Sequence, residues 1–157
     1  MKISKKKFVY LISPNKIKRS FYKDLDEILK LKKVSFFQLR LKGASFKKKI
    51  FIGKKIKKIC KKNKTKFLIN DDVLLARYLN SDGCHLGQKD MKILKARKIL
   101  KKKIIGITCH NSLALAKLAT KNKADYLAFG AFYHSKTKKT KFKANLSLLK
   151  KITKITK

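Results

Sequence analysis

Carboxylate side chains gather at two points of this sequence where a short apolar run ends. Asn70, Asp71 and Asp72 directly follow one such run, and Asp90 stands shortly after the next. The chain has only eight acidic residues against 45 basic ones, so grouping three of them beside apolar runs points to a specific role. Mg²⁺ prefers oxygen ligands and often bridges one or two carboxylates to substrate phosphates. The pattern therefore predicts a divalent-metal site held by Asp71 and Asp90.

Helix capping is the alternative role for the same two aspartates. Asp is a common N-cap residue, because its carboxylate accepts hydrogen bonds from unpaired N–H groups of the first helical turn. Both Asp71 and Asp90 precede segments with helical periodicity. For either residue alone the sequence leaves both roles open. The metal site is favoured when the two are taken together with the basic residues nearby.

Two groups of basic residues could meet an anion. Gln38, Arg40 and Lys42 are spaced by two, so in a strand all three would project to one side. Directing Arg and Lys into a protein interior is costly unless they meet an anion. The loop Ser135–Lys139 adds hydroxyl and ammonium donors that suit phosphate oxygens. A strand end that reaches solvent and a solvated lysine-rich loop are the alternatives left open.

The sequence offers no convincing protein nucleophile. Cys109 and His110 are adjacent, but adjacency does not aim one side chain at the other, so a thiol nucleophile is not predicted. What remains is a pair of carboxylates for a metal, several cations and hydroxyl donors. Such a set suits a diphosphate ester whose leaving group is neutralised by Mg²⁺, Arg and Lys, which is electrostatic catalysis of group transfer.

Six short apolar runs alternate with helical segments, which predicts parallel βα units with right-handed crossovers. The expected strands are 8–12, 34–39, 67–69, 83–86, 104–107 and 126–129. The polar clusters follow the C-terminal ends of these strands, the rim where (β/α) barrels build their sites. The expected fold class is therefore α/β, a TIM-type (β/α) barrel.

Periodicity also predicts which helical residues face the sheet. Leu25, Ile28 and Leu29 share one face of the first helix, and Leu74 and Tyr78 share one face of a short third helix. Ser112 is expected to be the N-cap of the helix that follows the fifth strand.

Composition limits the remaining possibilities. A chain of 157 residues with 44% hydrophobic residues is expected to form one globular domain despite a net charge of +37. Only four basic residues are Arg, so the lysines predict weak, sequence-blind attraction to polyanions and no specific nucleic acid. Three cysteines without close pairing argue against a disulfide framework. No apolar run is long enough to span a membrane, and a cytoplasmic protein is expected.

Five segments together resemble thiamine phosphate synthases in order and spacing, over nearly the whole chain. They are Gln38–Lys42, Leu68–Asp72, Asp82–Met91, Ile105–His110 and Ala124–Gly130, the last continuing through Lys138. The Asn-Asp-Asp and His-Leu-Gly-Gln-x-Asp pair is the specific part of this resemblance.

The resemblance implies a (β/α)₈ barrel that joins hydroxymethylpyrimidine diphosphate to a thiazole phosphate, giving thiamine phosphate and pyrophosphate. Asp71 and Asp90 would hold Mg²⁺. The pyrimidine diphosphate would be held by Gln38, Arg40, Lys42, Asn70, Thr108 and Lys138, among which Arg40, Lys42 and Lys138 would neutralise the leaving group. Ser135 and Thr137 would contact the thiazole phosphate.

The sequence departs from this family in its length. It supplies about six of the eight βα units, and the Gly-rich turns after strands 7 and 8, where barrels often bind phosphate, are not found in it. We therefore expect one incomplete barrel domain over residues 1–157, with exposed edges on its first and sixth strands. Activity would be impaired or would depend on a partner, and a homo-oligomer is one way to supply it.

Two other functions fit parts of the pattern. A related thiazole tautomerase would use His110 as an acid and base, although such a reaction needs neither a metal nor a diphosphate site. A catalytically inactive remnant that binds polyanions would instead rely on the evenly scattered lysines, and its binding would fall steeply with salt.

Overall fold

The computed structural model describes residues 8–133 and 142–154, and in these ranges six strands alternate with six helices. The elements are β1 (Val9–Ile12), α1 (Phe21–Lys30), β2 (Val34–Leu39), α2 (Phe46–Lys62), β3 (Lys66–Asn70), α3 (Val73–Tyr78), β4 (Gly83–Leu86), α4 (Ile93–Leu100), β5 (Ile104–His110), α5 (Leu113–Lys121), β6 (Tyr126–Phe129) and α6 (Leu146–Thr153). All neighbouring strands pair in parallel and in chain order. The expected βα repeat is confirmed.

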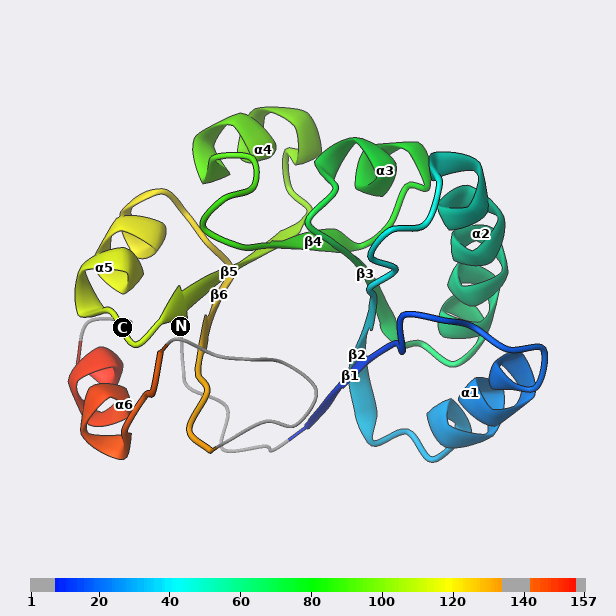
Figure 1. Cartoon of the computed structure of the whole chain (residues 1–157), viewed down its shortest axis with the longest axis horizontal. Coiled ribbons are helices and arrows are strands. Elements are labelled where there is room, and N and C mark those ends of the chain that lie inside the picture. Colours follow the sequence, from blue (N-terminus) through cyan, green and yellow to red (C-terminus); the bar gives the residue numbers. More distant parts are fainter. Residues whose placement is uncertain (1–7, 134–141, 155–157) are drawn as a thin grey trace.

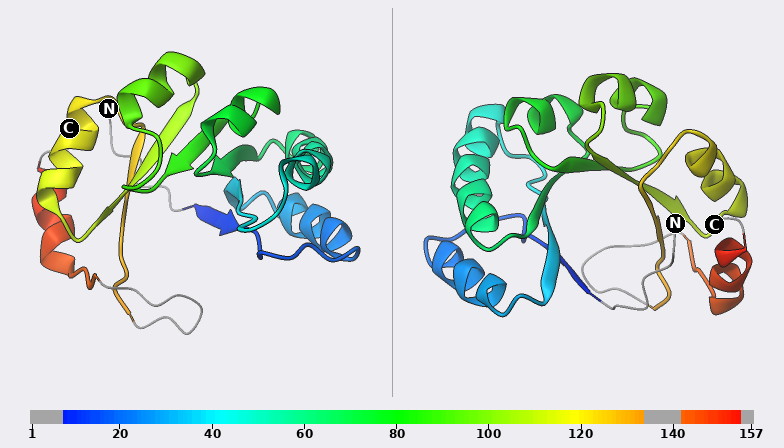
Figure 2. Two further views of the ribbon diagram at one scale, coloured as in Figure 1. Left: turned by 45° about the horizontal axis from the view of Figure 1, so that its top comes forward. Right: turned by 180° about the vertical axis from the view of Figure 1, so that it is seen from behind.

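The sheet curls into an open half-barrel with the helices on its outer side (Figure 1). The two further views show the same curvature, with β1 and β6 at opposite edges (Figure 2). Within the described ranges, no strand pairs with the outer edge of either β1 or β6. The predicted class, an incomplete TIM-type barrel of about six units, is thus confirmed.

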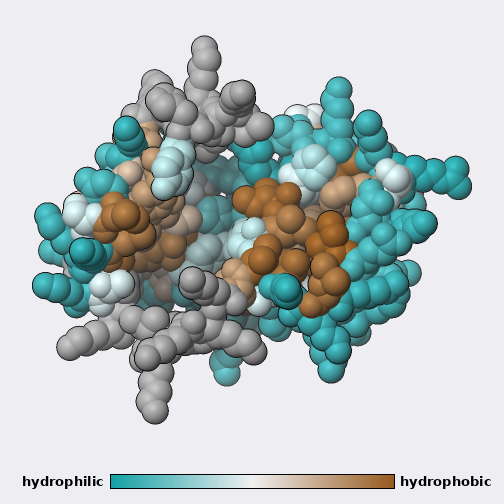
Figure 3. Space-filling model, turned by 90° about the horizontal axis from the view of Figure 1, so that it is seen from below, coloured by the Kyte–Doolittle hydropathy of each residue, from teal (hydrophilic) through white to brown (hydrophobic). Residues whose placement is uncertain are grey.

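Hydrophobic side chains border the gap between the two edge strands. Seen from that side, the surface carries apolar patches on both flanks of the opening (Figure 3). Val9 and Ile12 of β1 are 48% and 50% exposed, and Phe8 just before them is 57% exposed. Edge strands with exposed apolar groups are prone to association, so this opening is the least protected part of the described sheet.

The main core lies between the sheet and the helices. Phe37, Phe67 and Ile69 from the strands pack with Leu29 of α1 and Ile56 of α2, and each is 1% exposed or less. Burying a side chain of this size contributes roughly 1.5–3 kcal/mol, so this layer dominates the stability of the fold. It also fixes the strand ends, and therefore the position of the polar groups that follow them.

Two predicted helix faces differ from the structure. On α1, Leu25 and Leu29 are buried as expected, but Ile28 is 44% exposed. On α3, Leu74 and Tyr78 are 59% and 60% exposed. α3 buries Val73, Leu75 and Ala76 instead. In a helix of six residues two adjacent stripes are almost equally periodic, so packing against β3, β4 and α4 decides which stripe is buried.

Two sets of polar contacts shape the outer layer of helices: one caps α5, and the other joins α1 to α2. Ser112 accepts a hydrogen bond from the backbone N–H of Leu115, which confirms it as the N-cap of α5. On α1, Asp26 accepts hydrogen bonds from Lys62 (2.8 Å) and Asn63 (2.8 Å) at the end of α2. These bonds lower the pKa of Asp26 to about 2.

A glycine makes room for an aromatic ring on the concave side of the sheet. Gly106 of β5 stands opposite Tyr126 of β6 in the strand register. A Cβ atom at position 106 would overlap the Tyr126 ring. Gly106 therefore lets this ring lie against the backbone of β5.

Acid should weaken the link between α1 and α2. Because folding depresses the pKa of Asp26, its contribution is present above the ordinary value of 3.8 and is lost as pH falls toward about 2. Replacing Asp26→Asn should remove this part of the acid response, so the melting temperature of the variant should fall less than that of the wild type between pH 4 and pH 2. Identical pH profiles for the two proteins would contradict the ion pair.

Replacing Gly106→Ala should destabilise the fold, because the new methyl group must displace Tyr126. Overpacking of this kind costs roughly 1–3 kcal/mol. Gly53→Ala in α2 is the matched control: its methyl group would press on the movable end of the Leu79 side chain and make an ordinary contact with Leu39 Cδ2 (3.5 Å), and Ala is favoured over Gly in a helix by about 1 kcal/mol. Urea unfolding should show a clear loss for the first variant and little change for the second; equal losses would refute the assignment.

Candidate functional site

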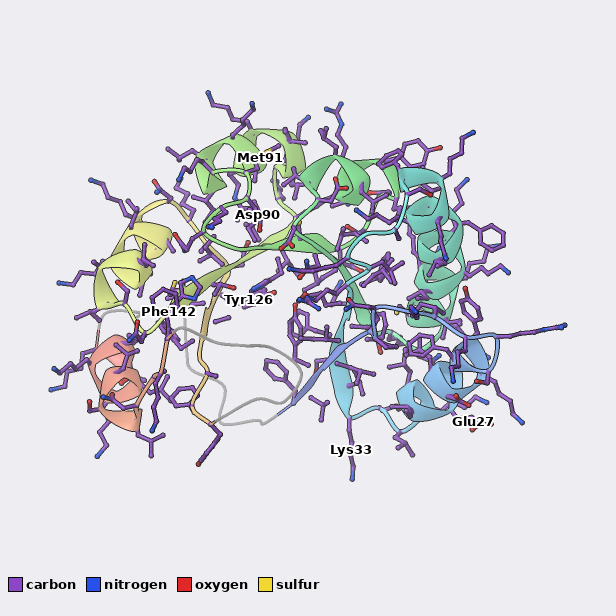
Figure 4. All side chains as sticks on the ribbon, in the orientation of Figure 1. Glu27, Lys33, Asp90, Met91, Tyr126 and Phe142 are labelled. Atoms are coloured by element: carbon purple, nitrogen blue, oxygen red, sulfur yellow. The ribbon has the colours of Figure 1, made fainter. Side chains whose placement is uncertain are left out.

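A cavity of about 460 Å³ lies at the C-terminal ends of β2, β3 and β4. Asn70 closes β3 and Asp71 follows it, while Asp90 comes from the loop between β4 and α4 (Figure 4). Lys42, which follows β2, also lines this cavity. The structure therefore brings together four of the residues that the sequence singled out, from three consecutive βα units.

The carboxyl groups of Asp71 and Asp90 are in contact. Burial raises the pKa of Asp71 above its ordinary value, and the hydrogen bond and charge of Asp90 raise it further, while Lys42 and Asn70 act in the opposite direction. Asp71 is held in this position by its backbone, which has φ +63° and donates its N–H to the carbonyl of His85 (2.8 Å). Two acidic groups kept together in this way form a place where a cation is favoured.

Capping does not explain either aspartate. The N-cap of α3 is Asp72, whose Oδ1 accepts the N–H of Leu75 (2.9 Å). The N-cap position of α4 is Lys92, without a side-chain cap. Asp90 instead closes its own loop by accepting the N–H of Gly87 (2.7 Å). The capping interpretation is therefore wrong for both Asp71 and Asp90.

Burial alternates from residue to residue at the end of β2, as the period-two spacing predicted. Leu39 and Leu41 are 3% and 7% exposed, whereas Lys42 is exposed. Arg40 is half-buried, and its Nη1 lies 3.4 Å from Oδ1 of Asn15 in the loop after β1. Arg40 thus lies near the same rim, although it is not among the residues that line the cavity.

A chain of hydrogen bonds crosses the concave side of the sheet. Gln38 is 3% exposed and donates to the hydroxyl of Tyr10 (2.8 Å), which lies 2.7 Å from the hydroxyl of Tyr126. Nδ1 of His85 is 2.8 Å from the Tyr126 hydroxyl, and Nε2 of His85 is 2.9 Å from Oγ1 of Thr108. Burial raises the pKa of both tyrosines, so they remain neutral donors and acceptors.

The sequence analysis identified the two ends of this row of hydrogen bonds, Gln38 and Thr108, but it missed the three residues between them. Tyr10, His85 and Tyr126 lie inside apolar runs, where they were counted as strand residues only. Period-two spacing could have identified His85, because its neighbours Cys84 and Leu86 are fully buried on the other side of β4. Tyr126 is central to the interior of the curled sheet (Figure 4).

The thiols are not suited to nucleophilic catalysis. Cys60, Cys84 and Cys109 are all free and buried. Burial raises the pKa of Cys60 to about 12 and that of Cys109 to about 11, so neither forms a thiolate near neutral pH. His110, next to Cys109, stacks on Phe142 with ring centroids 4.3 Å apart.

Three predicted site residues cannot be placed. Ser135, Thr137 and Lys138 lie outside the residues that the structure describes.

Comparisons with known proteins show the family of this chain. Residues 9–157 match the family model described as thiamine monophosphate synthase. The chain belongs to this family. The family predicted from the sequence is therefore confirmed, and with it the assignment to a class of transferase enzymes.

Individual relatives support the same assignment. A thiamine-phosphate synthase of Pelagibacter ubique is 68% identical over 152 residues, which cover 96% of this chain and 73% of that protein. One of Erythrobacter litoralis is 39% identical over 133 residues, covering 83% of this chain and 62% of that protein. The solved thiamine phosphate pyrophosphorylase of Pyrococcus furiosus superposes with a TM-score of 0.82 at 29% identity, over 96% of this chain and 71% of that one.

Replacing Tyr126→Phe should destabilise this member of the family, because it removes one hydrogen-bond partner from both Tyr10 and His85. Leaving such buried groups unpaired costs roughly 1–3 kcal/mol. Tyr133→Phe is the control, since Tyr133 is 88% exposed. Thermal unfolding should separate the two variants by several degrees; a Tyr126→Phe protein as stable as the control would show that the hydrogen-bond chain contributes nothing.

Proposed function

We propose that this chain uses the cavity at the ends of β2, β3 and β4 to bind hydroxymethylpyrimidine diphosphate, and that its reaction joins the pyrimidine to a thiazole phosphate. In that transfer the bond between the pyrimidine methylene and the diphosphate breaks, and the thiazole nitrogen takes the place of the leaving group. The products are thiamine phosphate and pyrophosphate. Family membership supports the reaction class.

The observation that carries the proposal is the contact between two carboxyl groups beside a lysine. Asp71 and Asp90 meet within a cavity that Lys42 and Asn70 also line. Few other arrangements explain why a chain of net charge +37 keeps two carboxyl groups this close together. A diphosphate needs cations on its oxygens, and a divalent metal on the two aspartates together with Lys42 would supply them.

The residues present fit Mg²⁺ as the metal. Burial raises the pKa of Asp71, and the neighbouring Asp90 raises it further; a bound cation would favour the charged form of both carboxyl groups. No cluster of three or more metal-binding His, Cys, Asp or Glu side chains occurs in residues 8–133 and 142–154. Two carboxylates agree with Mg²⁺, which keeps waters and takes further oxygens from a substrate phosphate. When bound, the metal would neutralise charge on the departing diphosphate.

The remaining residues take roles in the proposal according to their position. Lys42, and Arg40 on the same rim, would neutralise the leaving group, together with Lys138. Asn70, Gln38 and Thr108 would hold the pyrimidine diphosphate, with the last two fixed by the interior hydrogen-bond chain. Ser135 and Thr137 would contact the thiazole phosphate.

We further propose that residues 1–157 act as a single barrel-type domain with small-molecule substrates, in which the last two βα units are not represented. In the described part of the chain no helix is long and apolar enough to cross a membrane. That the protein is cytoplasmic and that it forms a homo-oligomer are predictions from the sequence. The tautomerase alternative gains no support from the Asp71–Asp90 pair, since tautomerisation requires no metal.

Calorimetry with the pyrimidine diphosphate, with and without Mg²⁺, tests the binding step, and formation of thiamine phosphate from both substrates tests the reaction. We expect binding that requires Mg²⁺. Absence of both metal-dependent binding and turnover would overturn the proposal. Turnover of the thiazole alone that survives loss of Asp71 would favour a tautomerase.

Replacing Asp71→Asn should abolish the metal response while leaving the fold at least as stable. The neutral amide removes repulsion with Asp90, so the melting temperature without metal should stay constant or rise. Mg²⁺ affinity should fall about 100-fold or more, because even partners outside the coordination shell are worth 10–100-fold.

Asp24→Asn is the matched control for this experiment. It makes the same change of charge at an exposed position on α1, far from the cavity. Calorimetric titration with Mg²⁺ should give wild-type affinity for this variant. If Asp71→Asn binds Mg²⁺ as well as Asp24→Asn does, the two aspartates are not the metal ligands.

A further inference from the structure

A second and larger cavity, of about 1000 Å³, lies at the opposite end of the strands. It is formed where α2, α3 and α4 end and β3, β4 and β5 begin. We call it the basic basin, and its lining residues include Lys57, Lys61, Lys64, Lys66, Lys101, Lys102 and Lys103. Nothing in the proposed transferase reaction uses it.

The basin carries a large excess of positive charge. Against its seven lysines stands a single carboxylate, Asp82. That carboxylate is already engaged: it accepts hydrogen bonds from Lys66 (3.0 Å) and from the backbone N–H of Phe67 (2.9 Å). Most of the positive charge in the basin is therefore not neutralised by the protein.

Two of the lysines have a structural role. Lys57 donates to the carbonyl of Leu79 (2.8 Å), and Lys103 donates to Asn80 Oδ1 (2.6 Å) and to the carbonyl of Ser81 (2.5 Å). These groups stand at or just after the C-terminus of α3, where cations are favoured by the helix dipole. Burial lowers the pKa of Lys103, and the charge of nearby Lys57 contributes.

Four other lysines are available to a ligand. Among the residues described, the ammonium groups of Lys61, Lys64, Lys101 and Lys102 have no hydrogen-bond or ion-pair partner. Lys61 lies in the last turn of α2 and Lys64 just after that helix, whereas Lys101 and Lys102 follow α4. Their backbones are fixed by turns, as shown by the hydrogen bonds from Lys64 N to Lys61 O (3.2 Å) and from Lys101 N to Arg97 O (2.8 Å).

The lining indicates which anion would bind. Phe67 is the only aromatic residue among the lining residues, and it is 1% exposed, so no ring is available to stack on a base. No arginine lines the basin, so bidentate recognition of a planar group is not provided either. Lysines act as point charges toward phosphate oxygens, and ammonium groups from two separate segments of the chain suit an anion with several phosphates.

We propose that the basic basin binds linear oligophosphates of three or more phosphate groups, as an anion site separate from the transferase site. Such a chain could be free oligophosphate or the triphosphate of a nucleotide, and the phosphates are what the two share.

Lysine is abundant over the whole chain, so the test compares equal losses of charge at two places. The basin variant carries Lys61→Gln, Lys64→Gln, Lys101→Gln and Lys102→Gln. The control variant carries Lys117→Gln, Lys150→Gln, Lys151→Gln and Lys154→Gln, all exposed positions on or next to α5 and α6. Tripolyphosphate is titrated into each protein by calorimetry in the absence of divalent metal, with circular dichroism confirming the fold.

We expect tripolyphosphate affinity to fall at least tenfold in the basin variant and less than twofold in the control. Equal losses in both would show attraction by net charge alone and overturn the proposal, as would an absence of binding by the wild type. A third protein, Lys42→Gln, should bind tripolyphosphate as the wild type does. If it does not, the phosphates occupy the transferase cavity and the basin is not a site.

Two further ligands distinguish the source of the phosphates. Equal affinity for ATP and tripolyphosphate would identify the phosphate chain itself as the ligand and support the basin. Tighter binding of ATP would require recognition of the base or sugar, which the lining does not provide, and would contradict the proposal. A single-stranded RNA that binds more tightly than either, with no effect of the basin substitutions, would contradict it. Failure of the transferase assay leaves this test intact, because it requires neither Mg²⁺ nor turnover.

Discussion

Parallel pairing in strict chain order is the constraint on which the rest of the structure depends. Each of the six strands runs in the same direction as its neighbours, so every C-terminal end lies on one rim and every N-terminal end on the other. A polar residue at the end of any strand, or a few positions beyond it, therefore lies on the same side of the molecule. This is how residues as distant in sequence as Lys42, Asn70 and Asp90 come to share one cavity.

The same constraint explains how much the sequence could reveal. All six strands were located to within one residue at their N-terminal ends, because hydrophobic runs are local features. The structure places Lys42, Asn70, Asp71 and Asp90 together at the rim, whereas Thr108 lies within β5 and the cluster Ser135–Lys139 falls outside the described residues. Contacts across the concave side could not be found in this way. The meeting of Tyr10 with Tyr126 depends on the curvature of the sheet, which no local pattern encodes. The buried face of the short helix α3 was mistaken for a related reason, since too few turns exist to choose between stripes.

The rare carboxylates show a second regularity that the sequence did not suggest. Asp82 precedes β4 and accepts the N–H of Phe67 in β3, and Asp125 precedes β6 and accepts the N–H of Ile105 in β5. In both cases an aspartate just before one strand satisfies a backbone donor at the start of the strand before it. The carboxylates of this very basic chain are thus mostly committed to backbone donors or to ion pairs. Against that background, the contact between the carboxyl groups of Asp71 and Asp90 is unusual.

The two ends of the strands are therefore electrically different for a structural reason. At the C-terminal end the loops lead into helix N-termini. The partial positive charge of these N-termini suits phosphates, and the Asp residues there suit the metal that would accompany them. At the N-terminal end the loops follow helix C-termini, whose carbonyls attract lysines, and two lysines there are used in that way. The basin contains seven lysines, and only some of them bond to a carbonyl group or to its single carboxylate. An excess of fixed positive charge in a concave surface is costly unless an anion shares it, which is why the basin, and not the lysines scattered over the helices, is where a second anion would be held.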